Sequence, residues 1–462
     1  MIVHHFTPPK KIAFAVGVSV LLALLSPVCT FADDDFPQAL PEDLGLRLPT
    51  NGNVIPGNGR RVVIPNDVIG INTANDNANN AVGNIHIEVG DHFVVMLPSG
   101  KLISVKKSRT TITDREFKSA TKKQLLDQYR QSAFAKFKTK STNHYVYVYN
   151  CSRGFVDGTS RILETMYPVL FNWCKNYGLE PKDPQFPMVV LIFATEEEFQ
   201  KYRPMPSGVV AYYNTVTNHV VMYEQRKIAT SAPEIAFKQS VSTIAHEGVH
   251  QVLHNIDVQD RLAQWPVWIS EGMAEFFAPT ELKGRARWKG VGLTNDLRLY
   301  ELANFYRAIG DAKLTRGQLL RQTIESQTLN SLGYAMAWST VDYLVKRRRR
   351  AFTAYLQDVS ELKPLESSTP GALFTKHFGT DYVKAERKIG KHVATLPYKD
   401  PVENQVHYLA KKWEGPNKEI KVSTSRVRIA QFLRGLNANE FRVGIFPNRT
   451  AAAQAGERWL RE

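Results

Sequence analysis

The stretch TIAHEGVHQVLHN, residues 243–255, constrains the fold of this chain more than any other feature. In an α-helix, residues four apart lie on one face, so His246 and His250 point two imidazoles in the same direction. Glu247 lies about 100° further round the helix and can face the same space. The alternative is an ordinary core helix that contains histidines, because the flanking residues are apolar. Either interpretation predicts a helix over about 233–255.

The order His-Glu-x-x-His on a helix is typical of a zinc site in which the glutamate is the general base. Zinc suits two imidazoles and one carboxylate, with a fourth position left for water. Gly248 weakens the helix by about 1 kcal/mol relative to alanine. It also leaves room beside the site or for a neighbouring helix. The motif therefore predicts metal ligands at His246 and His250 and a base at Glu247.

A second apolar segment, WPVWISEGMAEFF at 265–277, predicts a helix that starts near Pro266 and ends before Pro279. Glu271 and Glu275 lie four residues apart on it and face the same way. A carboxylate on a tightly packed second helix is what a site with two histidines lacks. His254 is the competing ligand, but it is turned about 80° from His246 around the helix. We expect His254 at the surface or behind the ligands.

HEGVHQ followed by WPVWISEGMAEFF resembles the gluzincin metallopeptidases, the clan with HExxH and a downstream glutamate. The pair is most similar to secreted bacterial proteins of the peptidase-MA-like group that carry a W-x-x-E-G-x-A-E-(Y/F)-F signature. The resemblance covers roughly 143–360. It implies zinc ligands at His246, His250 and Glu271 and a general base at Glu247. It also implies that Glu275 orients a zinc-bound histidine, and a solvated glutamate is the alternative.

The resemblance further implies a β-hairpin whose edge holds an extended substrate, for which VVAYYNTVTNHVVMYE at 209–224 is the candidate. It implies a tyrosine on a later helix that stabilises the oxyanion. LGYAMAWSTVDYLV offers Tyr334, with Tyr343 as the alternative, and a core aromatic is the other interpretation. The spacing to Glu271 is longer than in the best-known aminopeptidase branch, and no G-A-M-E-N-like motif is present. Endopeptidase and exopeptidase activity therefore both stay open.

The N-terminus has the order of a secretory signal peptide. Lys10 and Lys11 precede an apolar run, and small residues lead to a cleavage site after Ala32. The run is short for a membrane span, and no later run is long and apolar enough to cross a membrane. We therefore expect a protein that is exported, secreted or periplasmic, and that has no transmembrane segment after cleavage.

The rest of the chain predicts an α+β fold in four parts. An Asn/Gly/Pro-rich lead at 33–84 is expected to be flexible, and 85–142 to form a small β-hairpin and helix module. Residues 143–395 are expected to form the peptidase-MA-like domain, a small sheet with a hairpin edge packed on a helical subdomain. Residues 396–462 are expected to form a small C-terminal α/β segment.

The net charge bears on which partners the protein could bind. The formal net charge of +15 at pH 7 favours anionic partners, but no nucleic-acid motif accompanies it, so no nucleic-acid partner is predicted. The basic run at 346–350 follows a helical pattern, where it complements the helix dipole.

After signal cleavage two cysteines remain, Cys151 and Cys174. In an oxidising compartment they form either a disulfide or two buried thiols.

These features together predict an exported zinc-dependent peptidase that acts on a peptide or protein substrate. One alternative is a non-catalytic binding protein on a metallopeptidase scaffold. Another is a zinc hydrolase of a non-peptide amide. The sequence does not determine the substrate or the oligomeric state.

Overall fold

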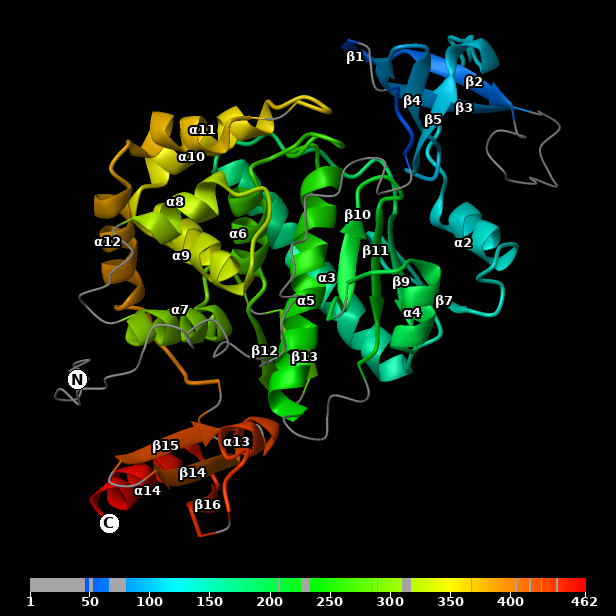
Figure 1. Cartoon of the computed structure of the whole chain (residues 1–462). Coiled ribbons are helices and arrows are strands. Elements are labelled where there is room, and N and C mark those ends of the chain that lie inside the picture. Colours follow the sequence, from blue (N-terminus) through cyan, green and yellow to red (C-terminus); the bar gives the residue numbers. More distant parts are fainter. Residues whose placement is uncertain are drawn as a thin grey trace.

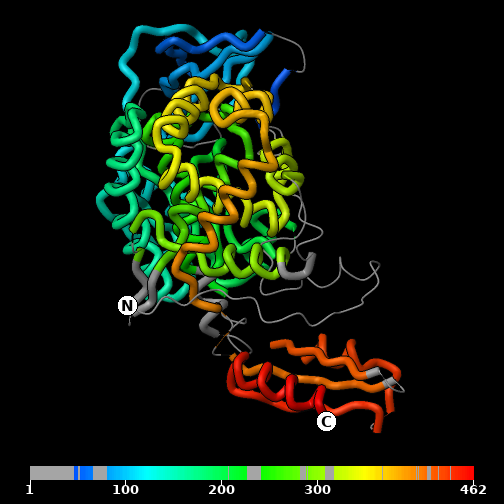
Figure 2. Tube along the Cα trace, turned by 90° about the vertical axis from the view of Figure 1, so that its left-hand side faces the viewer, coloured from blue at the N-terminus to red at the C-terminus, as the bar shows by residue number. Residues whose placement is uncertain are grey.

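The protein has a mixed α+β architecture, seen here in a computed structural model, and its described residues form four sheets, of which the smallest is the pair β12-β13. The structure describes residues 46–49, 53–65, 80–206, 208–225, 233–283, 285–288, 290–309, 317–366, 368–401, 403, 405–414, 417–424, 426–437 and 439–462. The predicted signal peptide, 1–32, lies outside them. Figures 1 and 2 show an N-terminal sheet at one end of a central domain and a smaller C-terminal module at the other.

The elements follow one another along the chain in three groups. The N-terminal group is β1 (Val54–Pro56), β2 (Arg61–Pro65), β3 (Asn80–Val89), β4 (His92–Met96), β5 (Leu102–Lys106), the 3-10 helix η2 (Lys107–Arg109) and β6 (Thr111–Ile112). The central group is α2 (Lys122–Arg130), β7 (Lys138–Ser141), β8 (Tyr145–Tyr149), α3 (Arg153–Asn176), β9 (Met188–Phe193), α4 (Glu196–Tyr202), β10 (Ala211–Asn214), β11 (His219–Tyr223), α5 (Pro233–Asn255), α6 (Val267–Phe277), β12 (Thr280–Lys283), β13 (Arg285–Trp288), α7 (Asp296–Ile309), α8 (Gln318–Glu325), α9 (Ser331–Arg347), α10 (Arg349–Ser360), α11 (Pro370–Phe378) and α12 (Tyr382–Val393). The C-terminal group is β14 (His407–Glu414), β15 (Asn417–Ser423), α13 (Arg426–Phe432), β16 (Phe441–Phe446) and α14 (Arg449–Arg461).

The N-terminal sheet differs from the hairpin module that the sequence predicts. It is antiparallel, in the order β5-β4-β3-β2-β6, and β1 also pairs with β3. Strands β1 and β2 lie in the range 33–84, for which composition predicted a flexible lead, and the boundary at 84/85 falls inside β3. The Asn/Gly residues between β1 and β2 form a turn, with positive φ at Asn58 and Gly59. In this turn, turn chemistry was therefore mistaken for flexibility. The rest of the predicted flexible lead, at 33–45, 50–52 and 66–79, lies outside the described residues.

The central sheet positions the candidate site. Its order is β10-β11-β9-β8-β7, and β9 pairs in parallel with both β8 and β11. Side chains alternate between two buried faces, so Val190 packs with α3 and α5 while Leu191 packs with α2 and α4. Both β7 and α2 therefore belong to this domain, although the predicted boundary placed them in the 85–142 module. β7 is an edge strand that is paired on one side only, and its sequence, KTKS, is polar and partly exposed. It therefore lacks the apolar pattern by which a strand is recognised in a sequence.

The motif helix α5 and the following helix α6 have the bounds that the sequence predicts. Helices α6 to α12 form a helical subdomain beside the central sheet (Figure 1). In the C-terminal module, α14 packs on a sheet of order β15-β14-β16 around Leu409 and Trp459. None of the described helices combines the length and the apolar character that crossing a membrane requires.

The N-terminal sheet is joined to the central domain at the turn between β10 and β11. The Leu102 N–H donates to the Val216 carbonyl at 2.7 Å, and both side chains lie in one apolar cluster with Leu262. The buried Arg261 guanidinium donates to the carbonyls of Gly100 and Thr215. The two parts therefore share an interface of buried apolar side chains and direct hydrogen bonds.

Cys151 and Cys174 are not bonded to each other in the structure, and both are buried as thiols. The pair therefore does not form the disulfide that was one of the two alternatives.

Candidate metal centre

Two glycines let the helices of the site pack closely. A Cβ at Gly248 on α5 would lie 2.8 Å from the Met166 side chain on α3 and would collide with its neighbour Leu163. A Cβ at Gly272 on α6 would lie 2.9 Å from the carbonyl oxygen of Ala337 on α9. The prediction that Gly248 leaves room for a neighbouring helix is therefore confirmed. α5 is fixed against α3, and α6 against α9.

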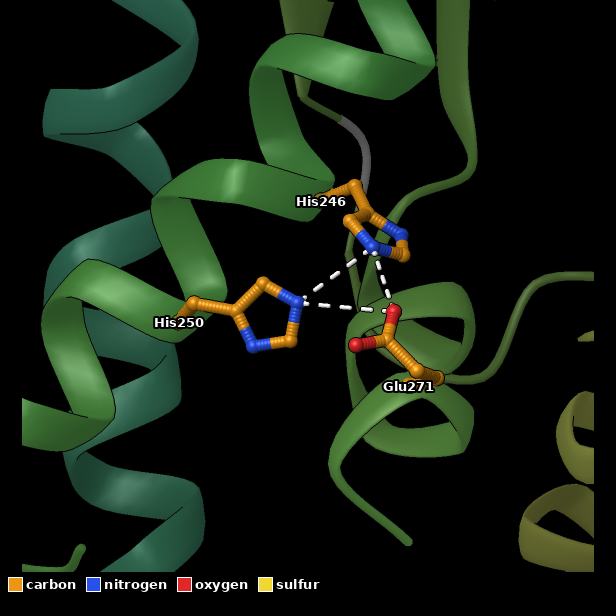
Figure 3. Close-up of side chains that lie close together, drawn as sticks. All are labelled: His246, His250 and Glu271. Atoms are coloured by element: carbon orange, nitrogen blue, oxygen red, sulfur yellow. Dashed lines mark hydrogen bonds and ion pairs between the residues drawn. The ribbon is translucent and has the colours of Figure 1, made fainter. Parts of the chain in front are cut away.

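His246, His250 and Glu271 converge on one point between α5 and α6 (Figure 3). Nε2 of His246 lies 3.0 Å from Oε2 of Glu271 and 3.3 Å from Nε2 of His250. Nε2 of His250 lies 3.6 Å from the same Glu271 oxygen. These three side chains form a candidate metal site.

The geometry fits an ion of the size of zinc. Tetrahedral zinc with bonds of about 2.0–2.1 Å holds neighbouring donor atoms roughly 3.3 Å apart. The three observed distances, 3.0, 3.3 and 3.6 Å, bracket that value. Two imidazole nitrogens that face each other, with a carboxylate beside both, make a donor set that a divalent cation satisfies.

Burial and charge act together on the ionisation of the site. Burial alone would lower the pKa of His246, but Glu271 and Glu275 raise it well above its ordinary value. Burial alone would raise the pKa of Glu271, but His250 and His246 lower it well below its ordinary value. The carboxylate therefore stays ionised, as a metal ligand must.

Glu247 lies beside the ligands on α5, partly exposed. Burial raises the pKa of its carboxyl group above the ordinary value, against the opposing charges of His246 and His250. A hydrogen bond from the Tyr213 backbone also holds its pKa down, which places the carboxylate next to β10. Glu247 thus lies between the ligands and an edge of the central sheet.

Of the two candidate tyrosines, Tyr334 lies at the site. Its ring centre is 6.2 Å from that of His246, and burial, together with the negative charge of Glu271, raises the pKa of its hydroxyl. Tyr343 lies further along α9 and its ring packs on His392 at 5.7 Å instead.

Glu275 is buried behind His246, with 2% of its surface exposed. Its Oε1 lies 3.4 Å from Nδ1 of His246, close enough for an ion pair but too far for an aligned hydrogen bond. Arg298 donates to Oε1 at 2.8 Å and Asn295 donates to Oε2 at 2.7 Å. Burial alone would raise the pKa of Glu275, but Arg298 and His246 lower it. Its carboxylate is therefore ionised and held in place.

Arg298 and Asn295 are the residues of this region that the sequence analysis missed. Both lie at the start of α7, in the stretch TNDLRLYE, which carries no recognisable motif. An arginine on the apolar side of a helical pattern was the one available signal, because a buried arginine needs a charged partner.

His254 does not join the site, and its expected place at the surface is wrong. It is 8% exposed, its ring stacks on Tyr213 at 5.5 Å, and Nδ1 lies 3.0 Å from the Gln259 carbonyl oxygen. Burial lowers its pKa to about 3. The 80° turn from His246 directs the ring toward β10, which covers it.

Part of this region matches a known protein-family model. Residues 240–366 match the model of a family described as "Protein of unknown function (DUF1570)". This range holds the three candidate ligands and Tyr334, and it is less than half of the chain. No curated protein matches the chain.

Among solved structures, the chain has distant similarity to M1 zinc metallopeptidases. A two-domain M1 zinc metallopeptidase mutant bound to L-arginine is 13% identical, with a TM-score of 0.24, over 57% of this chain and 52% of that chain. The M1 zinc metallopeptidase from Deinococcus radiodurans is 14% identical, also with a TM-score of 0.24, over 56% of this chain and 52% of that chain. The chain thus spans about half the length of these structures. A TM-score of 0.24 is too low to carry a conclusion about fold or function.

Proposed function

We propose that this protein is an exported, secreted or periplasmic, zinc-dependent peptidase. The observation that carries the proposal is the convergence of His246, His250 and Glu271 on one point, with Glu247 beside them. Two histidines and a glutamate are the donor set of hydrolytic zinc sites that keep one position open. A structural zinc site would fill all four positions with protein ligands.

When bound, zinc would polarise a carbonyl oxygen and lower the pKa of a water molecule in the open position. Glu247 would accept a proton from the attacking water as its oxygen adds to the peptide carbonyl carbon. As the carbon–nitrogen bond breaks, Glu247 would pass that proton to the leaving nitrogen. The Tyr334 hydroxyl, kept protonated by burial, would donate a hydrogen bond to the developing oxyanion.

The edge of the central sheet supports a peptide as the substrate. Within the described residues, β10 is one of the two edge strands of this sheet, and the Tyr213 backbone approaches Glu247. An extended peptide added to β10 would pair its backbone with the strand. Its carbonyl groups would then pass the base and the ligands.

The test combines metal content with cleavage. Purified protein should carry about one zinc per chain and should cleave members of a peptide library until a chelator is added. Glu247→Gln keeps the three donors, so it should retain zinc and lose hydrolysis by about 10²–10⁴-fold.

Glu164→Gln is the matched control, because Glu164 also pairs with a histidine, His144, at 2.7 Å and lies away from the donors. It should change neither property. If Glu247→Gln cleaves as fast as the unaltered protein, Glu247 is not the base.

A further inference from the structure

Arg298 is a buried cation behind the candidate metal centre that the proposed reaction does not use. Its side chain is 2% exposed, and it lies on α7, which carries none of the three donor groups. Nη2 donates to Glu275 at 2.8 Å and Nη1 donates to Glu301 at 3.0 Å. Burying a guanidinium is unfavourable unless charged partners surround it. The two carboxylates of Glu275 and Glu301 therefore fix where the Arg298 guanidinium lies.

The start of α7 holds both oxygens of the Glu275 carboxylate. Asn295 donates from Nδ2 to Oε2 of Glu275 at 2.7 Å, and its own side-chain oxygen accepts a hydrogen bond from the backbone N–H of Arg298 at 3.3 Å. Arg298 donates to the other carboxylate oxygen, Oε1. The carboxylate cannot rotate without breaking one of these bonds. Its Oε1 therefore stays on the side that faces His246.

The His246 ring is arranged to bind an ion through one nitrogen and to donate through the other. Nε2 points toward Glu271 and His250, while Nδ1 lies 3.4 Å from Oε1 of Glu275. Among the described residues, Nδ1 has no hydrogen-bond partner although it is buried. An approach of about 0.5 Å would give a normal hydrogen bond. That bond would fix the proton on Nδ1 and leave the Nε2 lone pair for a metal ion.

The same arginine packs on the tyrosine of the site. The Arg298 guanidinium carbon lies 5.1 Å from the centre of the Tyr334 ring, within the range of a cation–π contact. That ring lies 6.2 Å from the His246 ring. One cation therefore contacts the carboxylate behind a ligand and the ring beside that ligand.

We infer that Arg298 is a positioning residue of the metal centre, which sets the orientation of His246 through Glu275 and the place of Tyr334 directly. The inference rests on the proposed function, because it requires His246 to bind a metal ion. It makes α7 a part of the centre, although none of the three candidate donors lies on α7.

The first test measures zinc affinity by competition with a chromophoric chelator. Arg298→Met keeps the length of the side chain and removes the charge and the donors, so affinity should fall about 10–100-fold. Arg298→Lys keeps the charge without the planar fork and should recover part of that loss. Protein loaded with cobalt should show altered visible absorption bands in Arg298→Met, since those bands report the ligand geometry.

The matched control is Arg261→Met. Arg261 is also buried, at 4% exposure, and it donates to the backbone carbonyls of Gly100 and Thr215 rather than to a group at the metal site. This variant should lose thermal stability but keep the zinc affinity and the cobalt spectrum of the unaltered protein. An equal loss of zinc affinity in both variants would mean that Arg298 acts only through general stability.

A double variant keeps the test usable if Arg298→Met does not fold. Arg298→Met with Glu275→Gln removes both charges of the Arg298–Glu275 pair, so Glu275 is not left as an unpaired buried charge. Glu301 loses Arg298 in both variants but keeps the hydrogen bond that the Ser331 hydroxyl donates to it. If Arg298 acts through Glu275, the double variant should bind zinc about as weakly as Glu275→Gln alone. A further loss that multiplies the two effects would overturn this route.

The outcomes separate the two proposals. Unaltered protein that binds no zinc would overturn the proposed function. Unaltered protein that binds zinc, together with an Arg298→Met variant of unchanged zinc affinity and cobalt spectrum, would overturn only the inference about Arg298.

Discussion

Gly272 on α6 faces the backbone of Ala337 on α9 so closely that a Cβ at Gly272 would lie 2.9 Å from the Ala337 carbonyl oxygen. The contact is with a main-chain atom, which cannot turn away as a side chain can. The distance between α6 and α9 is thus set by the absence of a side chain at one position. Glu271 comes from one of these helices and Tyr334 from the other.

Gly272→Ala should therefore destabilise the protein by about 1–3 kcal/mol, the usual cost of forcing extra volume into a packed core. Chemical denaturation measures the free energy of unfolding. Gly390→Ala is the control, because Gly390 lies within α12 and a Cβ there would meet nothing within 4 Å. That variant should be neutral or more stable by up to about 1 kcal/mol. A Gly272→Ala protein as stable as the Gly390→Ala protein would contradict the close contact.

The histidines of α5 should differ in metal binding. His246→Ala and His250→Ala should each lose zinc, because each removes one of three protein donors. His254→Gln should retain it, because that ring packs on Tyr213 and not on the donors. Elemental analysis of the purified variants gives the zinc content per chain. Loss of zinc in His254→Gln, with the fold intact by circular dichroism, would show that the ligand set is misassigned.

The two tyrosines of α9 should separate catalysis from packing. Tyr334→Phe should lower kcat by about 10²–10³-fold with little change in KM, because the hydroxyl is needed only when charge develops on the oxygen. Tyr343→Phe should leave both values unchanged, since its ring packs on His392. Steady-state kinetics on one cleaved peptide decides between the two. Equal activity in Tyr334→Phe and the unaltered protein would make Tyr334 a packing residue.

His219 should make the protein less stable in acid. Burial lowers its pKa from 6.5 to about 3, and its Nε2 lies 2.9 Å from the Tyr129 hydroxyl. Between those two pKa values the unfolded chain binds a proton that the folded chain does not, so the free energy of unfolding falls as pH falls from 6.5 toward 3. One such proton contributes up to about 1.4 kcal/mol per pH unit.

His219→Gln keeps a partner for Tyr129 and removes the titrating group. The slope of unfolding free energy against pH, measured by urea denaturation between pH 4 and 6, should therefore decrease by roughly one proton. An unchanged slope would mean that His219 is protonated in the folded protein.

The two motif helices and the shared face of His246 and His250 were predictable because helical periodicity places residues three or four apart on one face. That rule relates positions within a helix, and it says nothing about which helix packs behind. Glu271, on the second helix, was predicted from the resemblance that the two motifs carry together. Arg298 lies 23 positions beyond Glu275, on a separate helix, and only the tertiary fold brings the two together. The same limit explains His254, since its angle around α5 was correct but the strand that covers it comes from elsewhere in the chain.

The N-terminal part was harder to predict for a different reason. Asn, Gly and Pro are enriched in both flexible chains and tight turns, so composition could not separate the two. Gly57 illustrates the difference, because a Cβ there would collide with the carbonyl of Ile85 in β3. Such a glycine is required by a neighbouring strand. That strand, β3, cannot be identified from the residues next to Gly57.

The joint between the N-terminal sheet and the β10–β11 turn determines where this chain can be shortened. A fragment that begins at residue 143, where the sequence suggests a domain boundary, would uncover Val216 and Leu262. It would also leave the buried Arg261 without the Gly100 carbonyl that accepts its hydrogen bond. Such a fragment would expose an apolar patch at the β10–β11 turn, beside the edge strand β10, and would aggregate there. Anyone who prepares the central domain for crystallisation should therefore keep the N-terminal sheet attached.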